Sequence, residues 1–198
     1  DPHIRFAELD LEDGDVLGRQ LLDHKKEHGG WDYIIHAAGV TKCRNPKDFD
    51  RINYGGTKNL ADVLLKLDMV PRQFAYLSSL SIFGPIREEP SVLHSPFPYE
   101  SSMQSAVGLQ QVVYHAISDT DIPCPNTAYG KSKVKAENYL KSLEGFPWII
   151  FRPTGVYGPR EKDYFLMAKS IRAHMDFAVG LHPQELTFVY VKDLIRAV

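Results

Sequence analysis

Two Tyr-x-x-x-Lys pairs, Tyr54 with Lys58 and Tyr129 with Lys133, have the residue types and spacing that could do chemistry. A deprotonated phenol can accept the proton of an alcohol while a hydride leaves the carbon, but an ordinary phenol has a pKa of about 10. An ammonium about 4 Å away would lower that pKa by roughly 3 units. One turn of helix places the lysine on the same side as the tyrosine. The spacing therefore predicts redox chemistry on a secondary alcohol.

The strands that precede the two pairs distinguish them, because chance supplies about one such pair in a chain of this composition. The apolar run before Tyr129 ends in "YLSSLSIFG", which places Ser78, Ser79 and Ser81 at or near its carboxyl end. Open α/β sheets hold their reacting groups at that end of the strands. The run before Tyr54 ends in "HAAG" and offers no hydroxyl. We therefore expect the chemistry at Tyr129, with a serine hydroxyl to orient the substrate oxygen.

The helix that carries Tyr129 is predicted over 126–140, with Asn126 or Thr127 as its N-cap. At helical spacing Lys133 falls on the same apolar face as Tyr129, whereas the other lysines of this helix fall on the opposite face. The plain alternative is that Lys133 buries only its stem and extends its ammonium into water.

The elements that position these residues alternate between strand and helix. Buried parallel strands are predicted at 32–38, 73–79 and 148–152, with helical patterns between them, and a further short strand at 186–191. This alternation predicts an α/β fold built on a Rossmann-type, doubly wound parallel sheet. The sequence contains no GxGxxG motif, with which a dinucleotide-binding fold usually opens, so we expect the first βα units to be missing.

Composition excludes several classes of function. The chain has 198 residues, of which 43% are hydrophobic and 24% charged, as in a single globular domain. The net charge of -2 gives no electrostatic reason to bind nucleic acid or an anionic membrane, and no apolar run approaches a membrane span. Cys43 and Cys124 are the only cysteines, which favours a reducing, cytoplasmic compartment. No spacing of histidines and cysteines indicates a metal site, and we read His36 as a structural histidine.

Six motifs in order carry a resemblance to a known family: "HAAGVTK", "INYGGTKNL", "YLSSLSIFG", "TAYGKSK", "FRPTGVYGPR" and "FVYVKDLIRA". From about Asp10 to Val198 the chain resembles the extended short-chain dehydrogenase/reductase family, specifically its NAD-dependent epimerase/dehydratase branch. The resemblance implies that Tyr129 is the catalytic base, and that Lys133 lowers its pKa and contacts the ribose. It also selects Ser79, rather than its serine neighbours, as the hydroxyl that orients the substrate.

The resemblance also implies a set of cofactor contacts. They are Asp10, Leu11, Ala37, Ala38, Gly39, Asn53, Tyr129, Lys133 and Pro153. Plain alternatives stay open for several of them: a helix cap for Asp10, small-residue packing for "HAAG", a helix-start amide for Asn53 and a turn for Pro153. The implied cofactor is NAD or NADP, with NAD the first choice. Without a Gly-rich loop, we expect this chain to bind it weakly or not at all.

The expected organisation is one partial NAD(P)-binding, Rossmann-like domain over 1–198. Residues 85–125 are an insertion, either a lid or binding loop or a helix packed on the body or a partner, and a substrate lobe begins near 154–198. The first choice of function is a nucleotide-sugar epimerase or dehydratase with a small-molecule substrate. The alternatives are a ketone or alcohol reductase for a steroid-like or flavonoid-like substrate, and a catalytically silent fragment or interaction module. A homodimer is left open.

Overall fold

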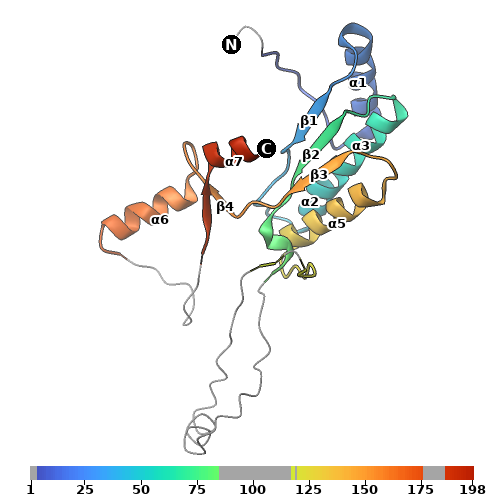
Figure 1. Ribbon diagram of the computed structural model, residues 1–198. Coiled ribbons are helices and arrows are strands. Elements are labelled where there is room, and N and C mark those ends of the chain that lie inside the picture. Colours follow the sequence, from blue (N-terminus) through green and yellow to red (C-terminus); the bar gives the residue numbers. More distant parts are fainter. Residues whose placement is uncertain (1–3, 85–116, 119, 176–185) are drawn as a thin grey trace, which may run out of the picture.

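The structure is a computed structural model that describes residues 4–84, 117–118, 120–175 and 186–198 (Figure 1). Its centre is a three-stranded parallel sheet in the order β1–β2–β3. The strands are Tyr33–His36, Gln73–Leu77 and Trp148–Phe151. In the register of the sheet, Ile35 pairs with Ala75, which pairs with Ile149. All three strands lie within the ranges predicted from the apolar runs.

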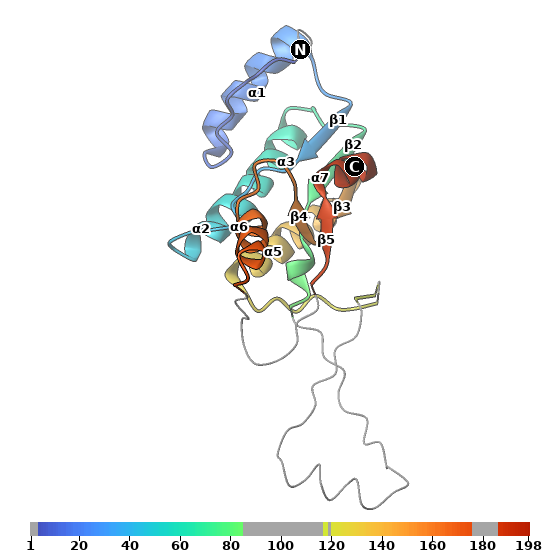
Figure 2. The ribbon, with the colours of Figure 1, turned by 90° about the vertical axis from the view of Figure 1, so that its left-hand side faces the viewer.

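Three helices, α1 (Gly14–His28), α3 (Gly56–Lys66) and α5 (Ala128–Ser142), lie together on one face of this sheet (Figures 1 and 2). Helix α1 starts at Asp13, whose carboxylate accepts hydrogen bonds from two backbone amides of the first turn. Helix α5 starts at Thr127, whose hydroxyl accepts from the Gly130 amide at 3.0 Å. Of the two predicted caps for α5, the threonine is the one used.

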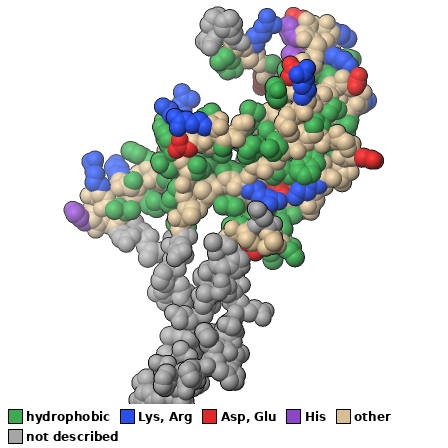
Figure 3. Space-filling model, in the orientation of Figure 1, with side chains coloured by type: hydrophobic (Ala, Val, Ile, Leu, Met, Phe, Trp, Pro, Cys, Tyr) green, Lys and Arg blue, Asp and Glu red, His purple; other side chains and the backbone are tan. Residues whose placement is uncertain are grey.

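The core lies between these helices and the sheet. The helices contribute Leu17, Leu21, Leu60, Leu64, Ala136 and Leu140, and the sheet contributes Phe74 and Tyr76. The opposite face of the sheet is open within the described residues, where Tyr33 is 69% exposed and Ile35 is 60% exposed. Figure 3 shows hydrophobic side chains over this region and over α6 (Asp163–Arg172). The Rossmann-type parallel sheet is confirmed, with helices on one of its faces in the part described.

A second, two-stranded parallel sheet follows the first. It pairs β4 (Gly155–Tyr157) with β5 (Phe188–Tyr190), and β5 leads directly into α7 (Val191–Ala197). The strand predicted at 186–191 is confirmed as β5. Strand β4 was not predicted, because three residues are too few to show a periodic pattern.

Residues 4–10 form no strand, because no neighbouring strand pairs with them within the described residues. Hydrogen bonds of the Gln20 amide to the backbone of Glu8 and Asp10 hold this segment against α1 instead. Most of the expected insertion, 85–116 and 119, lies outside the described residues. None of the described helices is both long enough and apolar enough to span a membrane.

The first prediction tests the core. Leu64 is completely buried, whereas its neighbour Leu65 is 42% exposed. We expect Leu64→Ala to lower the free energy of unfolding in urea by about 2–5 kcal/mol, because it leaves a cavity between the helices and the sheet. Leu65→Ala removes the same atoms from the surface and should cost less than about 1 kcal/mol. Equal losses in the two variants would contradict the packing described.

Candidate active site

Lys133 is buried, with 5% of its surface exposed, and its ammonium is turned inward. The Nζ atom donates a hydrogen bond to the Leu77 carbonyl oxygen at 2.9 Å and lies 4.9 Å from the centroid of the Tyr76 ring. Both partners belong to β2. Burial lowers the pKa of Lys133 to about 8, although the Glu137 carboxylate raises it in part. The alternative in which only the stem is buried is therefore wrong.

Ser79 and Tyr129 meet at the carboxyl end of β2. Ser79 caps a 3-10 turn, Leu80–Ile82, and its hydroxyl accepts from the Ser81 amide at 3.1 Å and lies 2.7 Å from the Ser81 hydroxyl. The Ser79 hydroxyl also acts on the half-buried Tyr129 phenol as a hydrogen-bonding neighbour. Of the three candidate serines, Ser78 is buried beneath this layer. The geometry thus brings together Ser79, Tyr129 and Lys133, while their roles stay predictions.

The pKa of Tyr129 differs from the expectation. Burial raises it, and the Ser79 hydroxyl offsets only part of that effect. The ammonium of Lys133 lies 5.9 Å from the centroid of the Tyr129 ring, because the Leu77 carbonyl binds it deeper in the molecule. The predicted lowering of the Tyr129 pKa by Lys133 is therefore wrong for this structure. Tyr129 is therefore protonated near neutral pH.

Asn53 lies in a π-helix, Asp50–Gly55, which joins the short helix α2 (Lys47–Phe49) to α3. Its side chain is buried and connects two segments. The Oδ1 atom accepts from the Val40 amide at 2.8 Å, and Nδ2 donates to the Val40 carbonyl at 3.0 Å and to the Ser132 hydroxyl at 3.1 Å. Asn53 thereby joins the loop after β1 to α5. Single π-helical turns of this kind occur frequently at functional sites.

Gly39 follows β1 and lies close to both Asn53 and Lys133. Its φ is +156°, and a Cβ at this position would lie 2.8 Å from Asn53 Oδ1 and 3.7 Å from Lys133 Nζ. A larger residue would collide with the Asn53 amide. The absence of a side chain at Gly39 therefore lets the loop after β1 pass close to Asn53 and to the buried lysine.

A cavity of about 540 Å³ opens beside this loop. It brings together Asp10, Leu11, Ala38 and Gly39, four of the predicted cofactor contacts. Its apolar and small side chains suit the adenine side of a dinucleotide. Asp10 also caps its own turn, because its Oδ1 accepts from the backbone amides of Glu12 and Asp13. The cap and the ligand role are compatible.

The two remaining predicted contacts lie nearby. Ala37 is exposed in the loop that contains Ala38 and Gly39. The Pro153 carbonyl accepts from the Leu80 amide at 3.0 Å, so Pro153 lies directly beside the 3-10 turn that Ser79 caps.

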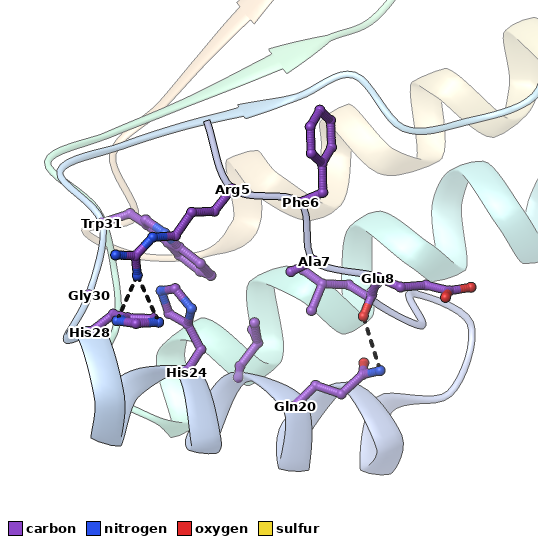
Figure 4. Close-up of a pocket in the computed structure, with 11 residues that line it drawn as sticks. Arg5, Phe6, Ala7, Glu8, Gln20, His24, His28, Gly30 and Trp31 are labelled. Atoms are coloured by element: carbon purple, nitrogen blue, oxygen red, sulfur yellow. Dashed lines mark hydrogen bonds between the residues drawn. The ribbon is translucent and has the colours of Figure 1, made fainter. Parts of the chain in front are cut away.

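A larger cavity, of about 710 Å³, lies between residues 5–9 and α1 (Figure 4). Its polar groups pair with one another: the Arg5 guanidinium lies 3.3 Å from His28 Nε2, and the His24 ring stacks on Trp31 at a centroid distance of 4.4 Å. None of the predicted catalytic residues lines either cavity. The smaller one contains Gly39, where a Cβ would lie 3.7 Å from Lys133 Nζ, so we assign the chemistry to the surroundings of the smaller cavity.

His36 is buried and hydrogen-bonded, as expected of a structural histidine, but sequence reasoning missed its partners and a second polar group. His36 Nε2 lies 2.9 Å from the Thr57 hydroxyl, which donates to the Asn53 carbonyl at 2.6 Å. Burial, aided by the charge of Lys133, lowers the pKa of His36 to about 4, so this histidine is neutral near neutral pH. The spacing of four between Asn53 and Thr57 was the available signal. The second group is Glu137 with Arg152, whose carboxylate and guanidinium form an ion pair.

The second Tyr-x-x-x-Lys pair lies elsewhere. Lys58 forms an ion pair with Asp62 and lies 5.1 Å from the centroid of the Tyr139 ring, on the outer side of α3 and α5. Tyr54 packs edge-to-face on the same ring at 6.2 Å. Cys43 and Cys124 are both free thiols. Among the described residues, no cluster of three or more histidines, cysteines or carboxylates could hold a metal ion.

Comparisons with known proteins show the family of this chain and support its fold. The sequence matches the model of the NAD dependent epimerase/dehydratase family over residues 1–198. The chain is 28% identical over 182 residues to the curated GDP-6-deoxy-D-mannose reductase of Pseudomonas aeruginosa. That alignment covers 84% of this chain and 52% of the relative, so the chain spans about half the length of the curated relative it matches.

Three solved structures share the fold. RMD from Pseudomonas aeruginosa complexed with NADPH has a TM-score of 0.66 at 25% identity, over 96% of this chain and 59% of that one. The dTDP-glucose 4,6-dehydratase DesIV of Streptomyces venezuelae, with NAD and TYD bound, has a TM-score of 0.71 at 19% identity, over 99% and 53%. The UDP-glucuronic acid 4-epimerase of Bacillus cereus, in complex with UDP-glucuronic acid and NAD, has a TM-score of 0.66 at 20% identity, over 97% and 53%.

The buried ammonium generates the second prediction. Because the pKa of Lys133 is about 8 in the folded chain and 10.5 in its ordinary state, the unfolded chain binds more protons between these values. The contribution of Lys133 to the free energy of unfolding should therefore increase as the pH rises from about 7.5 to 9.5. Near pH 7, Lys133→Met should raise the free energy of unfolding by up to about 3 kcal/mol, a gain that fades as the pH rises.

Chemical denaturation at a series of pH values measures this difference. Lys131→Met removes an exposed lysine from the same helix and should show no such dependence. A Lys133→Met variant that is less stable than the parent at every pH would contradict the description of a buried, costly charge.

Proposed function

The chain belongs to the NAD-dependent epimerase/dehydratase family, and from this premise we propose that it carries the reacting groups of an enzyme for NAD(P)-dependent redox chemistry on a nucleotide-linked sugar. One observation carries the proposal. Ser79, Tyr129 and Lys133 converge at the carboxyl end of β2, and Gly39, whose backbone lies close to Lys133 Nζ, lines the cavity of about 540 Å³. That edge of a parallel sheet is where α/β enzymes place their reacting groups.

The residues around the cavity fit a nicotinamide dinucleotide. Leu11, Ala38 and Gly39 would contact its adenine side, and Pro153 would lie beside the nicotinamide. Tyr129 and Lys133 would contact the adjoining ribose. When bound, such a cofactor exchanges a hydride with the substrate carbon. Related structures contain NAD or NADPH, so both cofactors belong to the proposal.

The chain's own residues would move the proton. In the proposed arrangement the Ser79 hydroxyl orients the substrate oxygen, and Tyr129 exchanges a proton with that oxygen. Because burial raises its pKa, Tyr129 holds its proton near neutral pH and is ready to donate it to a carbonyl oxygen. In the opposite direction Tyr129 must first lose that proton, and the positive charge of Lys133 favours the resulting tyrosinate.

Two kinds of reaction fit this chemistry. Epimerases and dehydratases for nucleotide sugars, the first choice, cause no net oxidation of the substrate. A reductase for a nucleotide-linked keto sugar is the second candidate, supported by the protonated Tyr129 and by the similarity to the Pseudomonas aeruginosa reductase. A reductase for a steroid-like or flavonoid-like ketone is the third.

Consumption of cofactor separates these candidates, which gives the third prediction. The longest product of the gene should convert at least one UDP-, GDP- or dTDP-linked sugar. Conversion by an epimerase or dehydratase leaves the NADH or NADPH absorbance at 340 nm unchanged, and product is detected by chromatography. A reductase instead consumes one reduced cofactor for each keto sugar. Turnover of simple ketones alone would reject the sugar assignment.

The two tyrosine–lysine pairs supply a matched control for that assay. Tyr129→Phe should lower kcat/KM by about 10²–10⁴, because it removes the group that transfers the proton. Tyr54→Phe alters the other pair, outside the site, and should leave kcat/KM unchanged. Similar losses in both variants would mean that the phenol of Tyr129 has no special role.

The fourth prediction concerns residues 1–198 alone. The sequence contains no Gly-rich loop whose amides could bind the cofactor pyrophosphate. Two such charge-assisted hydrogen bonds contribute roughly 1.5–3 kcal/mol each, so their loss weakens binding by about 10²–10⁴-fold. Calorimetric titration should therefore show NAD(H) and NADP(H) binding at about the millimolar level or weaker. Low-micromolar binding would show that another segment replaces the loop.

A further inference from the structure

An ion pair between a buried carboxylate and a half-buried guanidinium lies beneath the candidate site. Glu137 is 1% exposed, and Arg152 donates to both of its carboxylate oxygens, from Nε at 3.0 Å and from an Nη atom at 2.7 Å. Lys141, one turn further along α5, donates to the same carboxylate at 3.1 Å. Burial alone would raise the pKa of Glu137, but its hydrogen bonds hold the pKa below its ordinary value. Glu137 is therefore a carboxylate near neutral pH.

The pair joins the three segments that carry the site. Glu137 lies one turn after Lys133 on α5, and Arg152 immediately precedes Pro153 after β3. The Arg152 guanidinium also lies 5.3 Å from the centroid of the Phe83 ring, just beyond the 3-10 turn that Ser79 caps. A bidentate pair fixes both the distance and the angle between its partners. It therefore sets how α5 lies against the ends of β2 and β3.

The hydroxyl of Ser78 supports this placement. It is buried and makes no hydrogen bond of regular geometry, yet it lies close enough to Glu137 to help lower the pKa of that carboxylate. The carboxylate thus contacts groups on β2, β3 and α5 together. Removing it would leave the buried Ser78 hydroxyl without this neighbour and would break the ion pairs with Arg152 and Lys141, whose side chains are about a third exposed.

The negative charge of the Glu137 carboxylate acts on the Lys133 ammonium. The titratable groups that face its ammonium are His36 from β1, Tyr76 from β2, and Tyr129 and Glu137 from α5. The first three are neutral near neutral pH, since burial lowers the pKa of His36 and raises those of both tyrosines. Within the described part of the chain, Glu137 is the anion in this group.

We propose that Glu137 and Arg152 are positioning residues that together set the location and the charge of Lys133. The carboxylate favours the ammonium form of Lys133, and Arg152, together with Lys141, limits that effect by offsetting the carboxylate's charge. The inference rests on the proposed function for its catalytic meaning. Its physical content concerns Lys133 alone and needs neither cofactor nor substrate.

The experiment follows Lys133 directly. The ¹³Cε and ¹⁵Nζ shifts of Lys133, assigned by their loss in Lys133→Met, are recorded through a pH titration of residues 1–198. In Glu137→Gln the pKa of Lys133 should fall below that of the parent chain, because the anion is removed. In Arg152→Gln it should rise, because the carboxylate is no longer neutralised. Both variants should unfold at temperatures roughly 5–15 °C lower.

Opposite shifts of the Lys133 pKa in two variants that both destabilise the fold distinguish this role from a purely structural one. Shifts of that pKa in the same direction, or no shift, would overturn the proposal. Arg152→Lys keeps the positive charge but loses the bidentate geometry, so it should lower the unfolding temperature and leave the pKa of Lys133 near that of the parent. If Arg152→Gln does not fold, Arg152→Lys decides, because a large shift in that variant contradicts the charge argument. Asp23→Asn neutralises an exposed ion pair with Lys26 and should change neither quantity.

Because the titration contains no cofactor, its result is independent of whether the gene product turns over a nucleotide sugar. If the Lys133 pKa does not shift in opposite directions but the gene product is active, the positioning role is wrong and the proposed function stands. If the pKa shifts in opposite directions but the gene product is inactive on nucleotide sugars, the positioning role stands and the proposed function is wrong.

Discussion

The buried ammonium of Lys133 is the constraint on which the rest of the site depends. A charge removed from water needs polar or aromatic partners, because desolvation disfavours it strongly. The Leu77 carbonyl and the Tyr76 ring contact it from β2, and Gly39, which has no side chain, lets the loop after β1 pass close to it. These contacts can form only if α5 lies at one position along the sheet. Apolar packing of Ala136 and Leu140 alone would allow the helix to slide.

The polar groups beneath the site follow from the same constraint. His36 stays neutral because burial disfavours its charged form, and the charge of Lys133 adds to that effect. The Thr57 hydroxyl is the hydrogen-bond partner of His36, and the Asn53 side chain binds the loop after β1. The ion pair of Glu137 adds an opposite charge one turn away. Such buried polar networks stabilise little by themselves, but they specify one arrangement of the elements that form them. Here that arrangement is the one that opens the cavity.

The position of the ammonium also explains why Tyr129 behaves differently from the expectation. Residues four apart on a helix share a side, which correctly placed Tyr129 and Lys133 together. The lysine stem, however, extends toward the sheet and ends at a carbonyl of β2, while the phenol remains near the 3-10 turn of Ser79. Burial therefore dominates the pKa of the phenol. Shared helical spacing fixes the direction of a side chain but not the location of its charged end.

The sequence by itself determined the parallel strands, the helices between them and the edge of the sheet where Ser79, Tyr129 and Lys133 meet, because apolar periodicity and strand order are local patterns. It also indicated Gly39 and Asn53 through the motifs that contain them. Only the tertiary structure decided which groups surround the lysine, that residues 4–10 form no strand, and that Glu137 pairs with Arg152. Those outcomes depend on distances between segments far apart in the chain, and on how deeply each charge is buried. Neither the distances nor the burial can be derived from the spacing of residues along the chain.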